Sequence, residues 1–146
     1  MDCPIENKIS GLVITLNEEQ NIQSIINNLD FVDEIIIIDS YSSDRTVEIV
    51  KANSRVRLVQ NTFKNYSALR NLALGYASFP WILFLDADER IPEPLMQEII
   101  STVNEEKAND AYFFSESLCS IALLWNLADG KPTKTSDYLK KKRLAI

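Results

Sequence analysis

The sequence predicts an α/β protein whose mostly parallel sheet carries helices on both faces. Segments rich in β-branched and aliphatic residues alternate along the chain with segments whose apolar residues recur at helical spacing. The predicted strands are apolar throughout, which is typical of strands with both faces covered. Sheets of this kind bind ligands beyond the carboxyl ends of their strands, so polar residues that follow the strands are the first site candidates.

Five predicted strands alternate with four predicted helices. The strands are short runs of Ile, Val, Leu and aromatic residues; the third alternates with charged residues, which favours a place nearer a sheet edge. They cover residues 9–16, 34–39, 55–60, 81–85 and 111–114. The first helix is expected to begin at an N-cap Asn17, the second follows a Ser-rich turn, and the last has proline in its first turn. The helices lie within residues 17–31, 40–52, 66–77 and 92–106.

The composition is that of an ordinary soluble globular protein with one domain. The chain has 146 residues, of which 46% are hydrophobic and 25% charged, and its net charge of −6 argues against a nucleic acid partner. It has no histidine, which excludes imidazole chemistry, and Cys3 and Cys119 are too few for a disulfide framework. Neither a signal peptide nor a membrane-spanning apolar run is visible, so we expect a cytoplasmic protein.

The segment WILFLDADER, residues 81–90, joins a predicted buried strand to two carboxylates one residue apart. If the strand continues through Asp88, the side chains of Asp86 and Asp88 point the same way. Two carboxylates that face one place repel each other unless a cation or a proton lies between them, and a hard divalent ion fits this arrangement. The plainer alternative is a solvated turn that caps the next helix.

Other polar residues at predicted strand ends have both a functional and a structural interpretation. Thr15 and Glu18 are candidate ligand contacts, or else a strand residue and a first-turn carboxylate. Asp39 is a candidate contact, or else opens an Asx-turn. Arg70 either supplies positive charge to a nucleotide diphosphate or pairs with a surface carboxylate. With only three glycines, the chain cannot build a glycine-rich phosphate loop, so a phosphate bound here would need a metal.

Four ordered segments resemble the family 2 glycosyltransferases with the GT-A fold. VITLNEEQNI, VDEIIIIDSYSSDRTVEI, NYSALRNLAL and WILFLDADERI match that family in order and spacing, over residues 9 to about 114. The similarity is greatest to the bacterial subgroup that adds sugars to lipopolysaccharide core or related surface glycans. It implies a Rossmann-like nucleotide-diphospho-sugar transferase fold, a nucleotide-sugar donor that is often UDP-linked, a glycan or lipid-linked acceptor, and Mn²⁺ or Mg²⁺.

The resemblance also implies roles for individual residues. Asp39 would accept a hydrogen bond from the base, Asp86 would approach the ribose or the metal, and Asp88 would bind the metal. The residues implied to contact the nucleotide are Thr15, Asn17, Glu18, Asp39, Arg70 and Asp86. The family inverts the anomeric carbon: the ion stabilises the leaving diphosphate while a carboxylate deprotonates the acceptor hydroxyl.

The sequence after about residue 114 departs from the family pattern. Relatives carry there an aspartate that leads into a D-x-x-I/L-R-L-F motif, which this chain lacks, so no general base is assigned. We therefore predict a nucleotide-sugar-binding GT-A half-domain over residues 1–114 and an atypical tail over residues 115–146, with the acceptor-binding half missing. The charge changes at the same place, from 9 Lys/Arg against 18 Asp/Glu to 6 against 3.

Two explanations of this tail are open. One is a frameshift near Ser115, because permitted codons for residues 131–146 can be read in another frame as TDKNIRLFKKEKARY, which resembles the family segment. The other is a genuine extension, in which SIALLW forms a helix against the sheet and the basic KKKR segment contacts the inner face of the cytoplasmic membrane.

Three functions are compatible with these motifs. They are a metal-dependent inverting glycosyltransferase, a catalytically inactive nucleotide- and metal-binding remnant, and a phosphatase or phosphotransferase with Asp86 as nucleophile. The last is disfavoured because its D-x-D-x-T motif normally follows the first strand, and Arg90 stands where threonine should be. The missing general base separates the first two.

Overall fold

The structure is a computed structural model that describes the backbone of residues 7–105, 111–116 and 119–126, and the side chains of residues 7–105 except Arg70. Strands and helices alternate as predicted up to α4. The elements are β1 (Ile9–Thr15), α1 (Ile22–Asn28), β2 (Glu34–Asp39), α2 (Thr46–Lys51), β3 (Val56–Gln60), α3 (Tyr66–Tyr76), β4 (Trp81–Asp86), α4 (Glu93–Val103), β5 (Ala111–Glu116) and β6 (Cys119–Asn126).

The strands form one mostly parallel sheet, which confirms the predicted fold class. The strand order is β3-β2-β1-β4-β6-β5, in which the first four strands are parallel and β6 runs antiparallel to both of its neighbours. From β1 the chain winds outward through β2 to β3 and then returns to place β4 on the other side of β1. The order therefore reverses between β1 and β4, and the carboxyl ends of such strands are where α/β sheets bind ligands.

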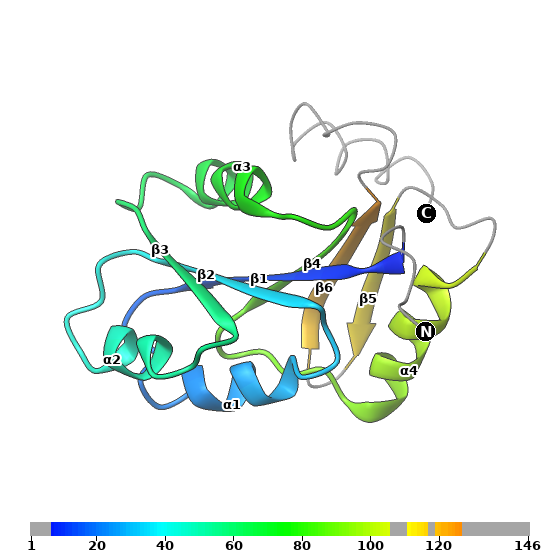
Figure 1. Ribbon diagram of the computed structural model, residues 1–146, viewed down its shortest axis with the longest axis horizontal. Helices are drawn as coiled ribbons and strands as arrows, with labels where there is room; N and C mark the ends of the chain where they lie inside the picture. Colours follow the sequence, from blue (N-terminus) through cyan, green and yellow to red (C-terminus); the bar gives the residue numbers. More distant parts are fainter. Residues whose placement is uncertain (1–6, 106–110, 117–118, 127–146) are drawn as a thin grey trace.

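Helices cover both faces of the parallel strands (Figure 1). On one face α1, α2 and α4 pack over a core that includes Ile37 and Leu85, whereas α3 packs on the other face over Ile36 and Phe84. Successive residues of one strand thus enter opposite cores, which explains the unbroken apolar runs in the sequence. None of the described helices has the length and apolar character needed to cross a bilayer.

The first helix begins later than predicted. Asn17 is not its N-cap: α1 begins at Ile22, with Asn21 at the N-cap position. Asn17 instead has a φ of 53°, a left-handed conformation that asparagine tolerates better than most residues. The segment between Asn17 and Ile22 instead forms a turn at the carboxyl end of β1, in which the N–H groups of Asn21 and Ile22 donate to the Glu18 carbonyl at 2.9 and 2.8 Å.

Residues 119–126 form strand β6, so the alternative in which SIALLW is a helix is wrong. This strand pairs with β4 on one side and with β5 on the other. The predicted boundary at residue 114 and the proposed frameshift stay predictions. The basic KKKR segment lies outside the described residues.

Replacement of Gly75 by alanine is expected to stabilise the fold. Gly75 is exposed in the last turn of α3, and a methyl group there would meet no atom within 4 Å. Because alanine loses less backbone entropy than glycine in a helix, Gly75→Ala should raise the free energy of unfolding by about 0.5 kcal/mol in urea titrations. Gly11→Ala is the matched control: its Cβ would lie 3.2 Å from Val32 Cγ2, and no gain is expected. A destabilised Gly75→Ala would contradict the open environment described.

Candidate functional site

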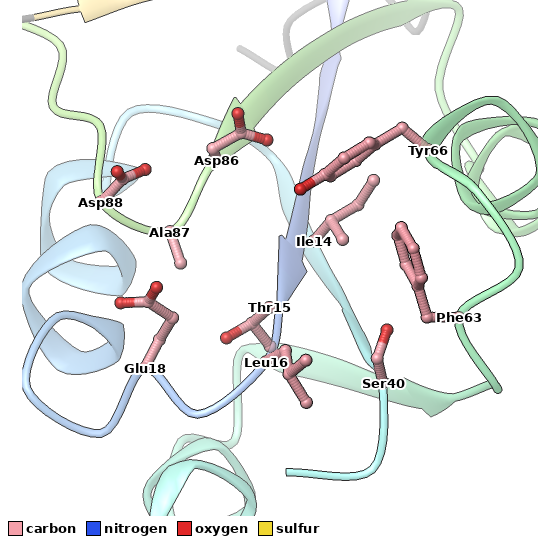
Figure 2. Close-up of a pocket in the computed structure, with 10 residues that line it drawn as sticks. All are labelled: Ile14, Thr15, Leu16, Glu18, Ser40, Phe63, Tyr66, Asp86, Ala87 and Asp88. Atoms are coloured by element: carbon pink, nitrogen blue, oxygen red, sulfur yellow. The ribbon is translucent and has the colours of Figure 1, made fainter.

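A cavity of about 410 Å³ opens at the carboxyl ends of the parallel strands (Figure 2). The register brings these ends together, since Ile14 of β1 pairs with Asp86 of β4 and Thr15 pairs with Asp39 of β2. The cavity thus lies beside the point where the strand order reverses. Its lining residues are Ile14, Thr15, Leu16, Glu18, Ser40, Phe63, Tyr66, Asp86, Ala87 and Asp88.

The D-x-D segment enters the cavity on a turn. Strand β4 ends at Asp86, so the prediction that strand alternation aligns Asp86 with Asp88 is wrong. The backbone N–H of Glu89 donates to the Asp86 carbonyl at 3.0 Å, and the Glu89 carboxylate accepts from the Asp86 N–H at 3.0 Å. Both aspartates nevertheless line the cavity, Asp86 half-buried and Asp88 exposed. A turn, and not the alternation of a strand, thus brings both aspartates to the cavity.

Arg90 ties this turn to the first helix. Its guanidinium donates to the carbonyl oxygens of Ala87 at 2.9 Å and Asn21 at 3.1 Å. Its Nε donates to Ser24 Oγ at 2.9 Å. Since Asn21 occupies the N-cap position of α1 and Ser24 lies in its first turn, the position of the D-x-D turn is coupled to that helix. The arginine of DADER therefore has a structural task in holding the carboxylates in place.

The wall formed by Glu18, Asp86 and Asp88 makes the cavity acidic. Among the described residues that line it, none is lysine or arginine, and the side chain of Arg70, in α3, lies outside the described part. Within that part, no three His, Cys, Asp or Glu side chains form a ready-made metal cage. Mg²⁺ is commonly held by one or two carboxylates together with substrate phosphates. The oxygen donors of Asp86 and Asp88 fit such a shared ion.

Asp39 lies at the same end of the sheet, where the parallel strands have their carboxyl ends, but does not line the cavity. It is fully buried, and its Oδ2 accepts hydrogen bonds from the Ser42 N–H at 3.0 Å and from Gln60 Nε2 at 3.1 Å. Its Oδ1 accepts from the Ser42 hydroxyl. These contacts fit the structural alternative, in which Asp39 organises the following turn. Its implied contact with a base stays a prediction.

Asn17 connects the loops that follow β1 and β2 and does not line the cavity. Its backbone N–H donates to Ser42 Oγ at 2.8 Å, and its side-chain oxygen accepts from the Ser43 N–H at 2.8 Å. Next to it, the Glu18 N–H donates to Thr46 Oγ1 at 2.9 Å. Side chains thus join two loops that are about 25 residues apart in sequence.

Asp44 closes the second of these loops. Partial desolvation acts to raise its pKa, but hydrogen bonds from the Thr46 hydroxyl, the Thr46 N–H and the Glu19 N–H outweigh this effect and lower the pKa below its ordinary 3.8. A carboxyl whose pKa is lowered by folding stabilises the folded state above its unfolded pKa. The contribution of Asp44 is lost as the pH falls from 3.8 through the lowered value.

Sequence reasoning did not single out six residues of the cavity wall, namely Ile14, Leu16, Ser40, Phe63, Tyr66 and Ala87. Three of them are strongly exposed, at 51%, 46% and 60% of their surface for Leu16, Phe63 and Tyr66. The available signal was a pair of aromatic residues in the polar segment after the third strand, with Phe63 before the helix and Tyr66 at its first residue. Ser40 carries no comparable signal.

The chain matches the model of the family described as glycosyl transferase family 2 over residues 10–137, a match that runs past residue 114. An uncharacterized glycosyltransferase of Rickettsia bellii is 34% identical over 96 residues, which are 65% of this chain and 32% of the relative. The lipopolysaccharide core biosynthesis glycosyltransferase LpsC of Rhizobium meliloti is 33% identical over 93 residues, 61% of this chain and 34% of LpsC. The chain therefore spans about a third of the length of these relatives.

A solved structure with the same fold is that of the mannosyltransferase PcManGT from Pyrobaculum calidifontis, in complex with GDP-Man and Mn²⁺. The TM-score is 0.57 at 22% identity, and the likeness covers 66% of this chain and 31% of that chain. At this identity the likeness concerns the fold alone. It confirms the predicted GT-A architecture of the parallel half of the sheet.

Removal of the Arg90 guanidinium is expected to loosen the D-x-D turn. Arg90→Ala deletes the hydrogen bonds to two carbonyl oxygens and one hydroxyl described above. We expect the free energy of unfolding to fall by about 2 kcal/mol, as measured by urea titration. Arg45→Ala is the matched control, because its exposed pair with Glu48 should contribute almost nothing. Equal losses in the two variants would contradict the role assigned to Arg90.

Proposed function

The chain belongs to glycosyl transferase family 2, and on this premise we propose that it binds a nucleotide-diphosphate sugar, with UDP as the nucleotide, for sugar transfer. The observation that carries this proposal is the gathering of Asp86, Asp88 and Glu18 around one cavity where the strand order reverses. Residues 1–114 are proposed to supply this donor-binding unit.

The metal site is proposed to lie at Asp86 and Asp88. Both residues line an acidic cavity, and a diphosphate would be repelled there unless a divalent cation were bound with it. Mn²⁺ or Mg²⁺ bound at this place would supply Lewis-acid stabilisation of the negative charge that grows on the leaving diphosphate. Glu89 and Arg90 orient the turn that presents the two carboxylates.

The remaining site residues are assigned according to where they lie. Thr15 and Glu18 line the cavity and are proposed to contact the nucleotide. Asn17 and Asp39 are proposed to act on the nucleotide site through the two loops that they hold. Arg70, on α3, is proposed to lie near the diphosphate, where a positive charge would offset the acidic wall.

Transfer is proposed to invert the anomeric carbon by direct displacement. The acceptor hydroxyl forms a bond to that carbon as the bond to the diphosphate breaks, and a carboxylate takes the hydroxyl proton. No described residue is assigned this role. The acceptor is proposed to be a glycan or a lipid-linked glycan, reached on the cytoplasmic side of the membrane, with the basic segment KKKR near anionic lipid.

A second candidate is a protein that binds the nucleotide and the metal but transfers no sugar. One observation favours it: the D-x-x-I/L-R-L-F motif that the family resemblance implies for the base does not occur in residues 115–146. The two candidates share the donor site and differ only in turnover.

UDP is expected to bind in a manner that depends on a divalent ion and on Asp88. Calorimetric titration with UDP, with Mn²⁺ and then with EDTA, should show tight binding only with the ion, because the acidic wall repels the free diphosphate. Asp88→Ala should weaken binding at least about tenfold. Glu98→Gln, an exposed carboxylate on α4 outside the cavity, is the matched control and should bind like wild type. Equal binding under all of these conditions would refute the metal assignment.

Turnover is measured separately with UDP-sugars and Mn²⁺. The transferase proposal expects release of UDP above the level given by Asp88→Ala, with a glycan acceptor raising the rate. Metal-dependent binding of UDP without any release would instead favour the second candidate.

A further inference from the structure

We propose that Phe63 and Tyr66 form an aromatic platform on which the nucleobase packs, and that the hydroxyls of Thr15 and Ser40 recognise its edge. The inference rests on the proposed nucleotide site and adds to it the residues that select the base. The contact of Asp39 with the base, which the family resemblance implies, stays a prediction beside it.

The two aromatic rings are exposed at the cavity and contact each other. Phe63 and Tyr66 expose 46% and 60% of their surface, and their ring centroids lie 5.2 Å apart in an edge-to-face arrangement with 77° between the planes. Neither ring belongs to the two core clusters of the sheet. Between them Asn65 caps α3, its side chain accepting from the Ala68 N–H at 2.8 Å, so the backbone that carries both rings is held by the helix start. Neighbouring exposed aromatic side chains on a cavity wall indicate a surface that binds an apolar or aromatic group of a ligand.

The platform lies at the end of the cavity where a base would be expected. It comes from the connection between β3 and α3, whereas Asp86 and Asp88 come from the end of β4, with β1 between β2 and β4. Figure 2 shows the two rings on one side of the cavity and Asp88 on the other. A nucleotide whose diphosphate lies at the carboxylates therefore extends its ring system toward Phe63 and Tyr66.

Two hydroxyls of residues on the cavity wall have no hydrogen-bond partner in the described part of the chain. Thr15 exposes 2% of its surface, and within the described part of the chain Thr15 Oγ1 and Ser40 Oγ are buried without a hydrogen bond. The two residues are adjacent, because the Ser40 N–H donates to the Thr15 carbonyl at 3.0 Å. A buried hydroxyl without a partner is costly, and it can both donate and accept. Thr15 and Ser40 both line the cavity, and their unpaired hydroxyls suit the alternating donors and acceptors on the edge of a pyrimidine.

Asp39 does not line the cavity and already accepts hydrogen bonds from Ser42 and Gln60, whereas the hydroxyls of Thr15 and Ser40 have no partner in the described part of the chain. An acceptor sugar, whose ring has an apolar face of C–H groups, is the other ligand that could pack on these aromatic rings. The adjacent unpaired hydroxyls at the ends of two neighbouring strands favour the base, because the edge of a base carries the donors and acceptors that such hydroxyls can pair with.

The test compares UDP with pyrophosphate, which lacks the base, by calorimetry in the presence of Mn²⁺. Phe63→Ala and Tyr66→Ala should each weaken UDP binding roughly tenfold and leave pyrophosphate binding unchanged. Tyr66→Phe keeps the ring and should bind UDP like wild type. Tyr41→Ala is the matched control, since Tyr41 exposes 59% of its surface outside the cavity wall and should have no effect.

The hydroxyls are tested with the same two probes. Thr15→Val and Ser40→Ala remove the hydroxyls with little change of shape, and each should weaken UDP binding about three- to tenfold without affecting pyrophosphate.

The outcomes separate this inference from the proposed function. Failure of wild type to bind UDP with Mn²⁺ would overturn both. Normal UDP binding by wild type, Phe63→Ala and Tyr66→Ala would overturn the platform alone. Unchanged UDP affinity with slower sugar transfer in the same variants would assign the rings to the acceptor, and equal loss of UDP and pyrophosphate would show general damage to the site. Both results would overturn the platform.

Discussion

Burial of both faces of the parallel strands is the constraint on which the rest of the structure depends. Ile36 and Ile37, neighbours in β2, enter different cores, so neither face of the strand has room for a polar side chain that serves a ligand. Polar groups must gather where the strands end. The reversal of strand order beside β1 then leaves space between the loops after β1 and β4, and the acidic cavity occupies it.

Side-chain hydrogen bonds hold these loops in one conformation. In glycine-rich phosphate loops, the backbone geometry has this role. Asn17, Ser42 and Asp39 form a continuous series of contacts across the ends of β1 and β2, extended to β3 by Gln60. Arg90 performs the equivalent task on the other side, between the D-x-D turn and α1. The polar residues of the motifs thus divide into those that face the cavity and those that hold the loops, and residue type alone does not tell the two groups apart.

Much of the fold follows from local patterns, and less of the site does. The apolar runs and helical periods predicted the alternating elements, and Asp86 and Asp88 were placed at the cavity because their segment follows a buried strand. The predicted start of α1 was wrong because Asn17 forms hydrogen bonds with a loop about 25 residues away in the sequence. Rules for helix capping consider only neighbouring residues and cannot anticipate such contacts. Local periodicity did not mark Phe63 and Tyr66 as cavity residues. Residues 119–126 were not predicted as a strand, because their pairing with β4 and β5 is a tertiary contact that the local sequence does not contain.

The antiparallel insertion of β6 has a consequence for biosynthesis. Strand β5 reaches the sheet only through β6, which follows it in the chain, so the ribosome releases β5 before its only described neighbour exists. Until residues 119–126 have emerged, the nascent protein presents the hydrogen-bonding edge of β4, a surface prone to aggregation. Chaperone demand during translation should therefore be high in the interval between the synthesis of β4 and that of β6.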